Sequence, residues 1–503
     1  MSGKYSNDYK ITNNLKSKRR GTTSRKLSSN GNKKTKFDAI LQLLAFIYVV
    51  ITIMFYISLI KMDMLPGIYV TIFTIAEMVF TFSMVVGLAK KRKSYKVNII
   101  CLIITILVSF VYINAINYLF ATDNFLKSMF TEVAEQEEYY VVIKKDSKYT
   151  KIEDISNETI YIFQVEDDVK TEMKNKSNIS LEQKGSLTDI GNSLINSDVK
   201  AILISSTQYN MLDDEIKDFK TNTKIIYTAT HKIEKKSEIV DKNSKNKIEN
   251  GIFNVYISGI DTYGNINNVS RSDANILATV NTKTHEVLLT SIPRDYYVTL
   301  HSKQAKDKLT HSGIYGVSET VTTVEDLLNI DINYYVRVNF TTVTKLVDTL
   351  GGIDVYSDYD FSTAGYSFKK GYNHLNGDAA LVFSRERYSF ASGDNQRVKN
   401  QQHVIEAIIK KVANSTTILT KYTNILNSLE GSFQTNIEQS EISKLVKNQL
   451  ENMSSWTVKS NSLTGTGSYG PTYSMGSQEL YIMLPDSTSV QNAKSQIKAV
   501  MGK

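Results

Sequence analysis

Residues 251–295 read GIFNVYISGIDTYGNINNVSRSDANILATVNTKTHEVLLTSIPRD, and this stretch is the most informative about the fold class. It contains three apolar runs rich in β-branched residues, IFNVYISGI, ANILATV and EVLLTSI, which are typical of buried strands. Helical patterns follow at residues 317–329, 340–350 and 394–412. Strands surrounded by such helices predict an α/β domain with a mixed central sheet flanked by helices.

Charged residues stand where these strands end or begin. Asp261 follows the first strand, and Arg271 and Asp273 come just before the second. Arg294 and Asp295 follow the third strand, next to one of the four prolines of the chain. Strand ends are where α/β sheets place ligands. Aspartate also caps turns and helices, so either carboxylate alone is weak support for a site.

Arginine is used sparingly in this chain. Ten arginines stand against forty-nine lysines, and past residue 93 every arginine falls between residues 271 and 397. A guanidinium group is planar, always charged and able to bind two oxygens at once. This distribution predicts a polyphosphate ligand bound by arginines, with a divalent metal between it and the carboxylates. Arg337, within the strand-like YYVRVNF, is better interpreted as a structural ion-pair partner.

Two later segments add further arginines. In SRER, Arg385 and Arg387 point the same way if the segment is extended, although an exposed charge cluster paired with Glu386 is the alternative. In GDNQRVKNQQ, residues 393–402, a helix begins, and Arg397 and Gln401 lie one turn apart on one face. A helix N-terminus favours an anion even before the arginine is considered.

The first 121 residues predict a membrane anchor. The apolar runs at residues 39–60, 66–89 and 97–121 each reach the length of about 20 residues that a spanning helix needs. Basic residues concentrate in residues 1–36 and 90–96, which places both on the cytoplasmic side and everything after about residue 122 outside. The basic tail is therefore interpreted as a topology signal and not as a DNA-binding segment.

Two further features bear on the membrane region. Glu77 lies within the second run, where an ionisable group is a functional suspect; a protonated Glu bonded to a neighbouring helix, for instance to Asn114 or Asn117, is the simpler account. The single cysteine, Cys101, lies in the third run. An outside region without cysteine suggests a bacterial surface protein that is stabilised by core packing.

The chain is thus divided into four parts. Residues 1–36 form a basic cytoplasmic tail and residues 37–121 three transmembrane helices. Residues 122–248 form a smaller accessory α/β domain and a lysine-rich linker, with strands expected at 139–144, 159–165 and 199–205 and a helix at 179–196. Residues 249–503 form the main domain, which continues with a helix at 438–453 and strands at 458–467 and 479–485.

The motifs GID (259–261), SRSD (270–273), IPRD (292–295), DKLTHSGIYG (307–316), RER (385–387) and GDNQRVKNQQ together resemble the LytR-CpsA-Psr family of cell-wall glycopolymer transferases. The resemblance covers roughly residues 251–413. Three transmembrane runs and an extra module are similar to the capsular-polysaccharide (CpsA or Wzg-like) branch. The resemblance implies an α/β/α core with a hydrophobic pocket for a polyprenyl pyrophosphate.

The resemblance also implies residue roles. Asp261 and Asp273 match the carboxylates that bind magnesium or manganese. The residues that match the pyrophosphate-binding positions are Arg271, Arg294, Lys308, Arg385, Arg387, Arg397 and Gln401. All of these except Lys308 are also expected to be catalytic, together with the two aspartates. The family motif often has Asn and Ala within the segment Thr310-His311-Ser312, which leaves the contribution of His311 open.

The implied activity is magnesium-dependent phosphotransfer. A polyprenyl-pyrophosphate-linked glycan, such as capsular polysaccharide or teichoic acid, is transferred to a peptidoglycan hydroxyl, with pyrophosphatase activity as a side reaction. The expected location is the bacterial plasma membrane, where capsule-synthesis proteins are further expected partners and nucleic acid is not. The alternative is a membrane-bound sensor or regulator of polymer synthesis that binds the same lipid-linked polymer.

Overall fold

The computed structural model describes residues 29–92, 94–130, 136–232, 251–260, 266–391, 393–414, 427, 431–452 and 456–502. Contacts divide the chain into two compact units. One comprises Met1–Met54 with Thr74–Tyr112, and the other comprises Phe55–Phe73 with Ile113–Lys503. Most of the predicted cytoplasmic tail and linker, and Asp261, lie outside the described residues.

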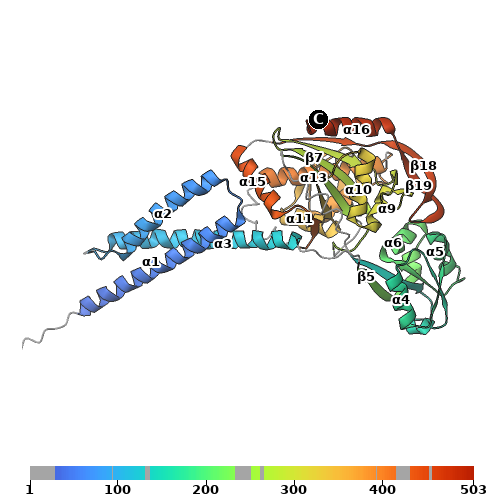
Figure 1. Ribbon diagram of the computed structural model, residues 1–503, viewed down its shortest axis with the longest axis horizontal. Helices are drawn as coiled ribbons and strands as arrows, with labels where there is room; N and C mark the ends of the chain where they lie inside the picture. The colour runs from blue at the N-terminus through green and yellow to red at the C-terminus, as the bar shows by residue number, and fades with distance from the viewer. Residues whose placement is uncertain are drawn as a thin grey trace, which may run out of the picture. The chain divides into compact units, whose positions relative to one another are not determined.

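Three long helices follow one another at the N-terminal end (Figure 1): α1 Ser29–Met62, α2 Gly67–Ala89 and α3 Lys96–Phe130. Within them, Lys36–Met62, Gly67–Ala89 and Lys96–Phe125 are long and apolar enough to cross a membrane. Side chains such as Phe46, Ile72 and Phe110 are exposed, as expected for helices that contact lipid. The prediction of three long apolar helices at the N-terminal end is confirmed.

Glu77 of α2 is hydrogen-bonded inside the first unit. Its Oε1 accepts from Thr81 Oγ1 at 2.7 Å, and its Oε2 accepts from the Tyr112 hydroxyl of α3 at 2.5 Å. The hydroxyls of Thr81 and Tyr48 lie 3.3 Å apart, which brings α1 into the same network. Glu77 therefore bonds to a neighbouring helix, as the simpler account expected, through Tyr112.

The accessory domain is a five-stranded sheet of order β3-β2-β4-β1-β5. Its strands are β1 Gln136–Lys144, β2 Thr159–Ile162, β3 Ser180–Gln183, β4 Ala201–Ser205 and β5 Thr223–Lys232. Its helices are the 3-10 helix Ile152–Ile155, α4 Asp167–Lys176, α5 Leu187–Ile195, α6 Ser206–Glu215 and α7 Phe219–Asn222.

The single helix expected at residues 179–196 is wrong in its first half. Residues 180–183 form β3, which pairs in parallel with β2. The helix α5 begins only after Ser186, whose hydroxyl accepts from the backbone N–H of Asp189. Strand pairing at the sheet edge thus overrides the helical pattern until a capping serine starts the helix.

The main domain contains a six-stranded sheet of order β16-β11-β6-β7-β8-β17. Its strands are β6 Ile252–Ile260, β7 Ser272–Asn281, β8 Glu286–Ile292, β11 Tyr334–Val338, β16 Phe433–Thr435 and β17 Thr457–Ser462. The pairs β11–β6 and β17–β8 are parallel and the other neighbours are antiparallel, so the predicted mixed sheet is confirmed.

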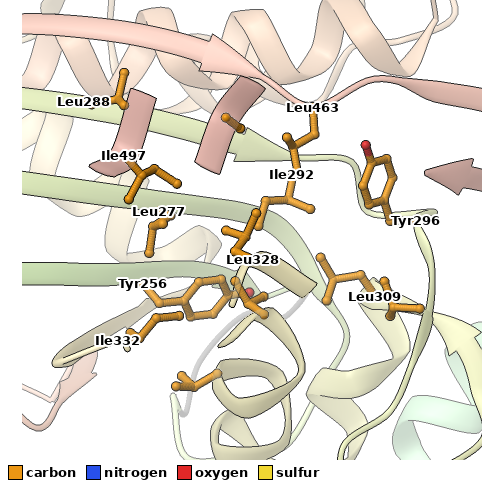
Figure 2. Close-up of a cluster of buried hydrophobic side chains, with 14 of the residues drawn as sticks. Tyr256, Leu277, Leu288, Ile292, Tyr296, Leu309, Leu328, Ile332, Leu463 and Ile497 are labelled. Carbon is orange, nitrogen blue, oxygen red and sulfur yellow. The ribbon is translucent and has the colours of Figure 1, made fainter. Parts of the chain in front are cut away.

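Helices cover both faces of this sheet. On one face, Tyr256, Leu277 and Leu288 pack with Leu328 of α10 (Val317–Leu328) and Ile497 of α16 (Ser487–Val500), as Figure 2 shows. On the other face, the alternate strand residues pack with α13 (Asp394–Asn414) and α15 (Gln439–Asn452). The main domain is therefore an α/β/α layer structure.

Shorter elements complete the main domain. They are β9 Tyr297–Thr299, β10 Lys306–Lys308, α9 Leu309–Ser312, the 3-10 helix Gly313–Tyr315, α11 Phe340–Thr349, β12 Ile353–Ser357, β13 Phe361–Thr363, β14 Tyr366–Phe368, β15 Gly371–Leu375, α12 Gly377–Arg385, β18 Gly465–Thr472 and β19 Gly476–Pro485. The strand expected at 458–467 is divided between β17 and β18.

Candidate functional site

The candidate site lies at the edge of the sheet where β6 and β8 end and β7 begins. In the register between β6 and β7, Gly259 pairs with Ala274 and Ile260 pairs with Ser272, so Asp273 is an extra residue between two pairs. Such a β-bulge bends the strand and redirects a side chain, and bulges are frequent beside active sites. Asp273 is thereby turned out of the regular alternation of β7.

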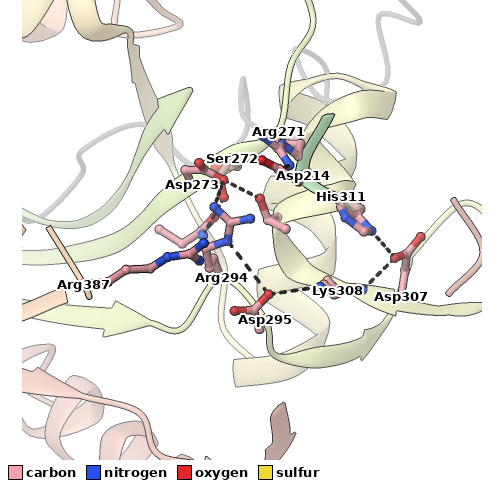
Figure 3. Close-up of polar contacts among 12 residues, drawn as sticks. Asp214, Arg271, Ser272, Asp273, Arg294, Asp295, Asp307, Lys308, His311 and Arg387 are labelled. Atoms are coloured by element: carbon pink, nitrogen blue, oxygen red, sulfur yellow. Dashed lines mark hydrogen bonds and ion pairs between the residues drawn. The ribbon is translucent and has the colours of Figure 1, made fainter. Parts of the chain in front are cut away.

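Asp273 is bound by groups from two other segments (Figure 3). Its Oδ1 accepts from Thr310 Oγ1 at 2.8 Å and lies 2.8 Å from Arg294 Nη1. Burial alone would raise the pKa of Asp273, but the charges of Arg294, Arg271 and Arg397 and the Thr310 hydrogen bond hold that pKa well below its usual range. One ionised carboxylate therefore stands among three guanidinium groups.

Asp295 and Lys308 extend this charged network. Asp295 Oδ1 lies 3.9 Å from Arg294 Nε and 3.4 Å from Lys308 Nζ. The backbone N–H of Thr310 donates to Arg294 O at 2.8 Å. The segment that carries Lys308 and Thr310 is thus fixed against the segment that follows β8, and the structure places Lys308 beside the arginine site.

Arg271 is buried just before β7. Its Nη1 donates to Asp214 Oδ2, from the accessory helix α6, at 2.5 Å. Behind it, a Cβ on Gly313 would collide with the Ser270 carbonyl oxygen and lie 2.7 Å from Ser272 N. Only glycine allows this close approach of the DKLTHSGIYG segment to the Arg271 backbone.

Arg385 and Arg387 differ in their surroundings. A common direction of the two side chains was expected only if the segment is extended. Arg385 is instead the last residue of α12, so the segment is not extended through both arginines. The Arg385 guanidinium carbon lies 4.2 Å from the centroid of the Phe340 ring. Arg387 donates to the Tyr388 hydroxyl, and Figure 3 shows its side chain extending toward Arg294 and Asp273.

Helix α13 supplies Arg397 to the site. Arg397 is buried, and Gln401 is half-buried one turn further along the same face. The next residue, Gln402, is buried and donates to Ser291 Oγ at 2.8 Å and to Asn461 O at 3.0 Å. Gln402 therefore fixes α13 to the end of β8, which positions Arg397.

A magnesium ion is compatible with part of this arrangement. Asp273 offers an ionised carboxylate, and Mg²⁺ characteristically takes one or two carboxylates and completes its shell with phosphate oxygens and water. Among the described residues, no cluster of three or more His, Cys, Asp or Glu side chains is present. Asp261, the second expected ligand, lies outside the described residues, so the metal site stays a prediction.

His311 and Arg337 lie in hydrogen-bond networks within the main domain. His311 is buried, with Nδ1 lying 2.6 Å from Asp307 Oδ1 and 2.7 Å from Ser474 Oγ, and this network joins α9 to the segment between β18 and β19. Arg337 is buried and donates to Gln434 Oε1 at 3.3 Å and to Asn268 O at 3.0 Å. Both side chains link separate segments of the chain.

Three residues that contact Asp273 or the site arginines were not assigned a role from the sequence: Thr310, Asp295 and Asp214. Asp295 was noted only as part of the arginine-containing window. Thr310 lies within the DKLTHSGIYG motif, so that motif was the available signal. Asp214 lies in the accessory domain, where no sequence pattern indicates its partner.

Comparison with known proteins places this site in a family. The LytR_cpsA_psr family matches residues 216–497. The chain is 39% identical over 221 residues to the polyisoprenyl-teichoic acid–peptidoglycan teichoic acid transferase TagU of Bacillus cereus, covering 42% of this chain and 72% of that protein. For the Enterococcus faecalis protein of the same name, the identity is 35% over 251 residues, which cover 48% of this chain and 81% of that protein.

Among solved structures, Bacillus subtilis TagU is similar, with 34% identity, a TM-score of 0.40, and coverage of 50% of this chain and 97% of that one. The family match spans more than half of the 503 residues, and the two curated relatives are matched over most of their length. The chain belongs to the LytR-CpsA-Psr family.

Proposed function

We propose that this protein transfers a glycopolymer from a polyprenyl-pyrophosphate carrier to a hydroxyl group of peptidoglycan. Transfer of a glycopolymer to peptidoglycan is supported by the relatives, which are named teichoic acid–peptidoglycan transferases. The observation that carries the finer assignment is the position of Asp273 among Arg294, Arg271 and Arg397. Three guanidiniums and the Lys308 ammonium outnumber the three carboxylates that pair with them, those of Asp273, Asp295 and Asp214, so the site favours an anionic ligand.

The reaction is a single displacement at phosphorus. The acceptor hydroxyl oxygen forms a bond to the phosphorus that carries the glycan, and the bond from this phosphorus to the bridging oxygen breaks. Polyprenyl phosphate leaves, and the glycan stays joined to peptidoglycan through a phosphodiester. Phosphoryl transfer gains mainly from positioning and neutralisation of charge, which Arg271, Arg294 and Arg397 supply. Lys308, Arg385, Arg387 and Gln401 are assigned to the same pyrophosphate.

The proton of the acceptor hydroxyl needs a base other than Asp273. A carboxylate whose pKa lies well below its usual range is a weak base, and Asp273 Oδ1 already accepts from Thr310 and lies beside Arg294. Asp261 is the proposed alternative, as a base or, together with Asp273, as a ligand of Mg²⁺ or Mn²⁺. When bound, the metal would supply further neutralisation of phosphate charge.

The membrane helices support the choice of a lipid-linked substrate. Three helices are long and apolar enough to span a membrane, so the protein is anchored in the layer that holds a polyprenyl carrier. We assign the N-terminus to the cytoplasm and the α/β domains to the outer surface of a bacterial plasma membrane. The polymer is an anionic wall glycopolymer of the teichoic-acid or capsular class.

The test is a transfer assay with the full-length protein in nanodiscs. It is incubated with a polyprenyl-pyrophosphate-linked glycan and peptidoglycan oligomers, with Mg²⁺ or with a chelator, and products are followed by mass spectrometry. We expect a phosphodiester-linked product and an equal amount of polyprenyl phosphate, both lost with chelator and restored by Mg²⁺. Binding of the lipid-linked glycan without any product would instead identify a sensor of the polymer.

Omission of peptidoglycan separates transfer from the side reaction. Release of polyprenyl phosphate without acceptor would measure pyrophosphatase activity. Asp273→Asn is the matched variant, since it removes the carboxylate charge and changes the side-chain volume little. We expect it to abolish product formation.

A further inference from the structure

The segment that leads into Arg271 is bound along its length by the accessory domain. The backbone N–H of Gln136 donates to Asn267 O, and Gln136 O accepts from the N–H of Val269, each at 3.1 Å. The hydroxyl of Thr207, in α6, donates to Val269 O at 3.2 Å. The path of the chain toward Arg271 therefore depends on contacts from outside the main domain.

A shared hydrophobic cluster fixes the two domains to each other at a second place. Ile314 follows directly after Gly313, and Ile314, Met475 and Leu480 of the main domain pack with Leu187 and Leu212 of the accessory domain. The backbone N–H of Leu187 also donates to Met475 O at 3.1 Å. These contacts hold α6 in a defined position beside the candidate site.

The C-terminal end of α6 brings two acids to the site. Asp214 Oδ2 lies 2.5 Å from Arg271 Nη1; the Arg271 side chain is 7% exposed and that of Asp214 is 54% exposed. Burial raises the pKa of the adjacent Glu215, and the charges of Lys308 and Arg271 oppose this rise. The charges of the last two residues of α6 therefore act on basic groups assigned to the pyrophosphate.

The geometry points to Asp214 as a positioning residue for Arg271, through which the accessory domain completes the pyrophosphate site. Arg271 is fixed from two sides, by Asp214 at its guanidinium and by Gly313 against its backbone. Asp214 precedes residues 216–497, which match the family. This role rests on the proposed function, because it concerns the same pyrophosphate.

Two different roles for Asp214 predict opposite changes in turnover when its carboxylate is neutralised. If its carboxylate only competes with phosphate for Arg271, neutralising it removes a negative charge near an anionic ligand, so affinity and turnover rise. If it positions Arg271, neutralising it weakens the charged contact that orients the guanidinium. Turnover then falls because misplacement of a catalytic group by about 1 Å can cost about 100-fold.

The experiment compares Asp214→Asn with Asp213→Asn in full-length protein. Asp213 lies next to Asp214 in α6 but pairs with Lys220 at 3.5 Å, so its replacement removes the same charge without touching Arg271. We measure kcat and KM for the lipid-linked glycan and the dissociation constant of farnesyl pyrophosphate. We expect kcat to fall about tenfold in Asp214→Asn without a rise in KM, and to stay within about twofold in Asp213→Asn.

A double-mutant comparison shows whether Asp214 acts through Arg271. In an Arg271→Ala background, Asp214→Asn should change neither farnesyl pyrophosphate affinity nor residual turnover further. Asp214→Glu, which retains the charge, should restore part of kcat. If Asp214→Asn unfolds the protein, as judged by limited proteolysis, the intermediate kcat of Asp214→Glu carries the same test.

Several results would overturn the inference. They are wild-type kcat in Asp214→Asn, a higher kcat/KM in that variant, or equal losses in Asp213→Asn and Asp214→Asn. If the wild-type protein carries out transfer, any of these results would reject the role of Asp214 and leave the proposed function standing. No transfer by the wild-type protein would reject the proposed function itself.

Discussion

Arg294 Nη1 and Asp273 Oδ1 lie 2.8 Å apart, although Arg294 follows the end of β8 and Asp273 lies near the start of β7. The pairing is possible because β7 and β8 are antiparallel neighbours, so the end of one lies beside the start of the other. The bulge at Asp273 then turns its carboxylate toward Arg294 and Thr310. This relationship defines the centre of the candidate site.

Arg294→Ala should lower kcat/KM by about 100- to 1,000-fold, the usual cost of removing one electrostatic contact to a developing oxyanion. Arg294→Lys keeps the charge but loses the planar fork, so we expect an intermediate loss. Steady-state kinetics with the lipid-linked glycan make the comparison. Lys459→Ala, which removes an exposed lysine from its ion pair with Glu286, is the control. Equal activity of Arg294→Ala and the control would contradict a role for Arg294 in catalysis.

Thr310→Val should lower kcat by about 10- to 100-fold, since a hydrogen bond to a charged group contributes about 1.5–3 kcal/mol. Thr310 is fully buried, and valine replaces its hydroxyl with a methyl group of similar size. Thr310→Ser retains the hydroxyl and should stay close to wild type in kcat. A similar loss in both variants would show that the methyl group, and not the bond to Asp273, is what matters.

Arg387→Ala should weaken farnesyl pyrophosphate binding more than Arg385→Ala does. Arg387 extends toward Arg294 and Asp273, while the guanidinium of Arg385 stacks on the ring of Phe340. Titration calorimetry on the two variants gives the comparison, with about a tenfold difference expected for one phosphate contact. If Arg385→Ala had the larger effect, the assignment of Arg387 to the central site would be wrong.

The stability of the main domain should fall as the pH drops below about 6.5, the ordinary pKa of histidine. Burial lowers the pKa of His311, although Asp307 opposes this shift. The unfolded chain therefore binds a proton that the folded chain does not, and stability is lost as pH falls toward the folded pKa.

His311→Asn removes this titration, so its melting temperature should change less between pH 7.5 and 5.5 than that of the wild type. His374→Asn is the control, because the His374 side chain is 61% exposed. Thermal unfolding in detergent at both pH values measures the difference. Parallel pH profiles for wild type and His311→Asn would contradict the effect assigned to the buried imidazole.

Much of the fold could be predicted because it depends on local pattern. The strands of residues 251–295 and the helices near 317–329, 340–350 and 394–412 are confirmed, since each carries its own apolar period. Residues 180–183 show where this reasoning fails. Their state is set by pairing with β2, which no local pattern reports.

The site could be predicted only as a set of residues. Arginine usage and the motifs indicated Arg271, Arg294 and Arg397, whose charges all lower the pKa of Asp273. The bulge at Asp273 could not be predicted, because a one-residue shift in register leaves no trace in the sequence of either strand. Asp214 was missed because its partner lies 57 residues away and in another domain.

Phosphotransfer at the arginine site is tested by the rate of phosphodiester formation by wild type, Arg271→Ala and Arg397→Ala with the same lipid-linked glycan and peptidoglycan acceptor. Both arginines act on Asp273 from different segments, one before β7 and one in α13. We expect each variant to stay folded and to lose transfer by about 100-fold or more. Full turnover in both variants would contradict a role for these arginines in phosphotransfer.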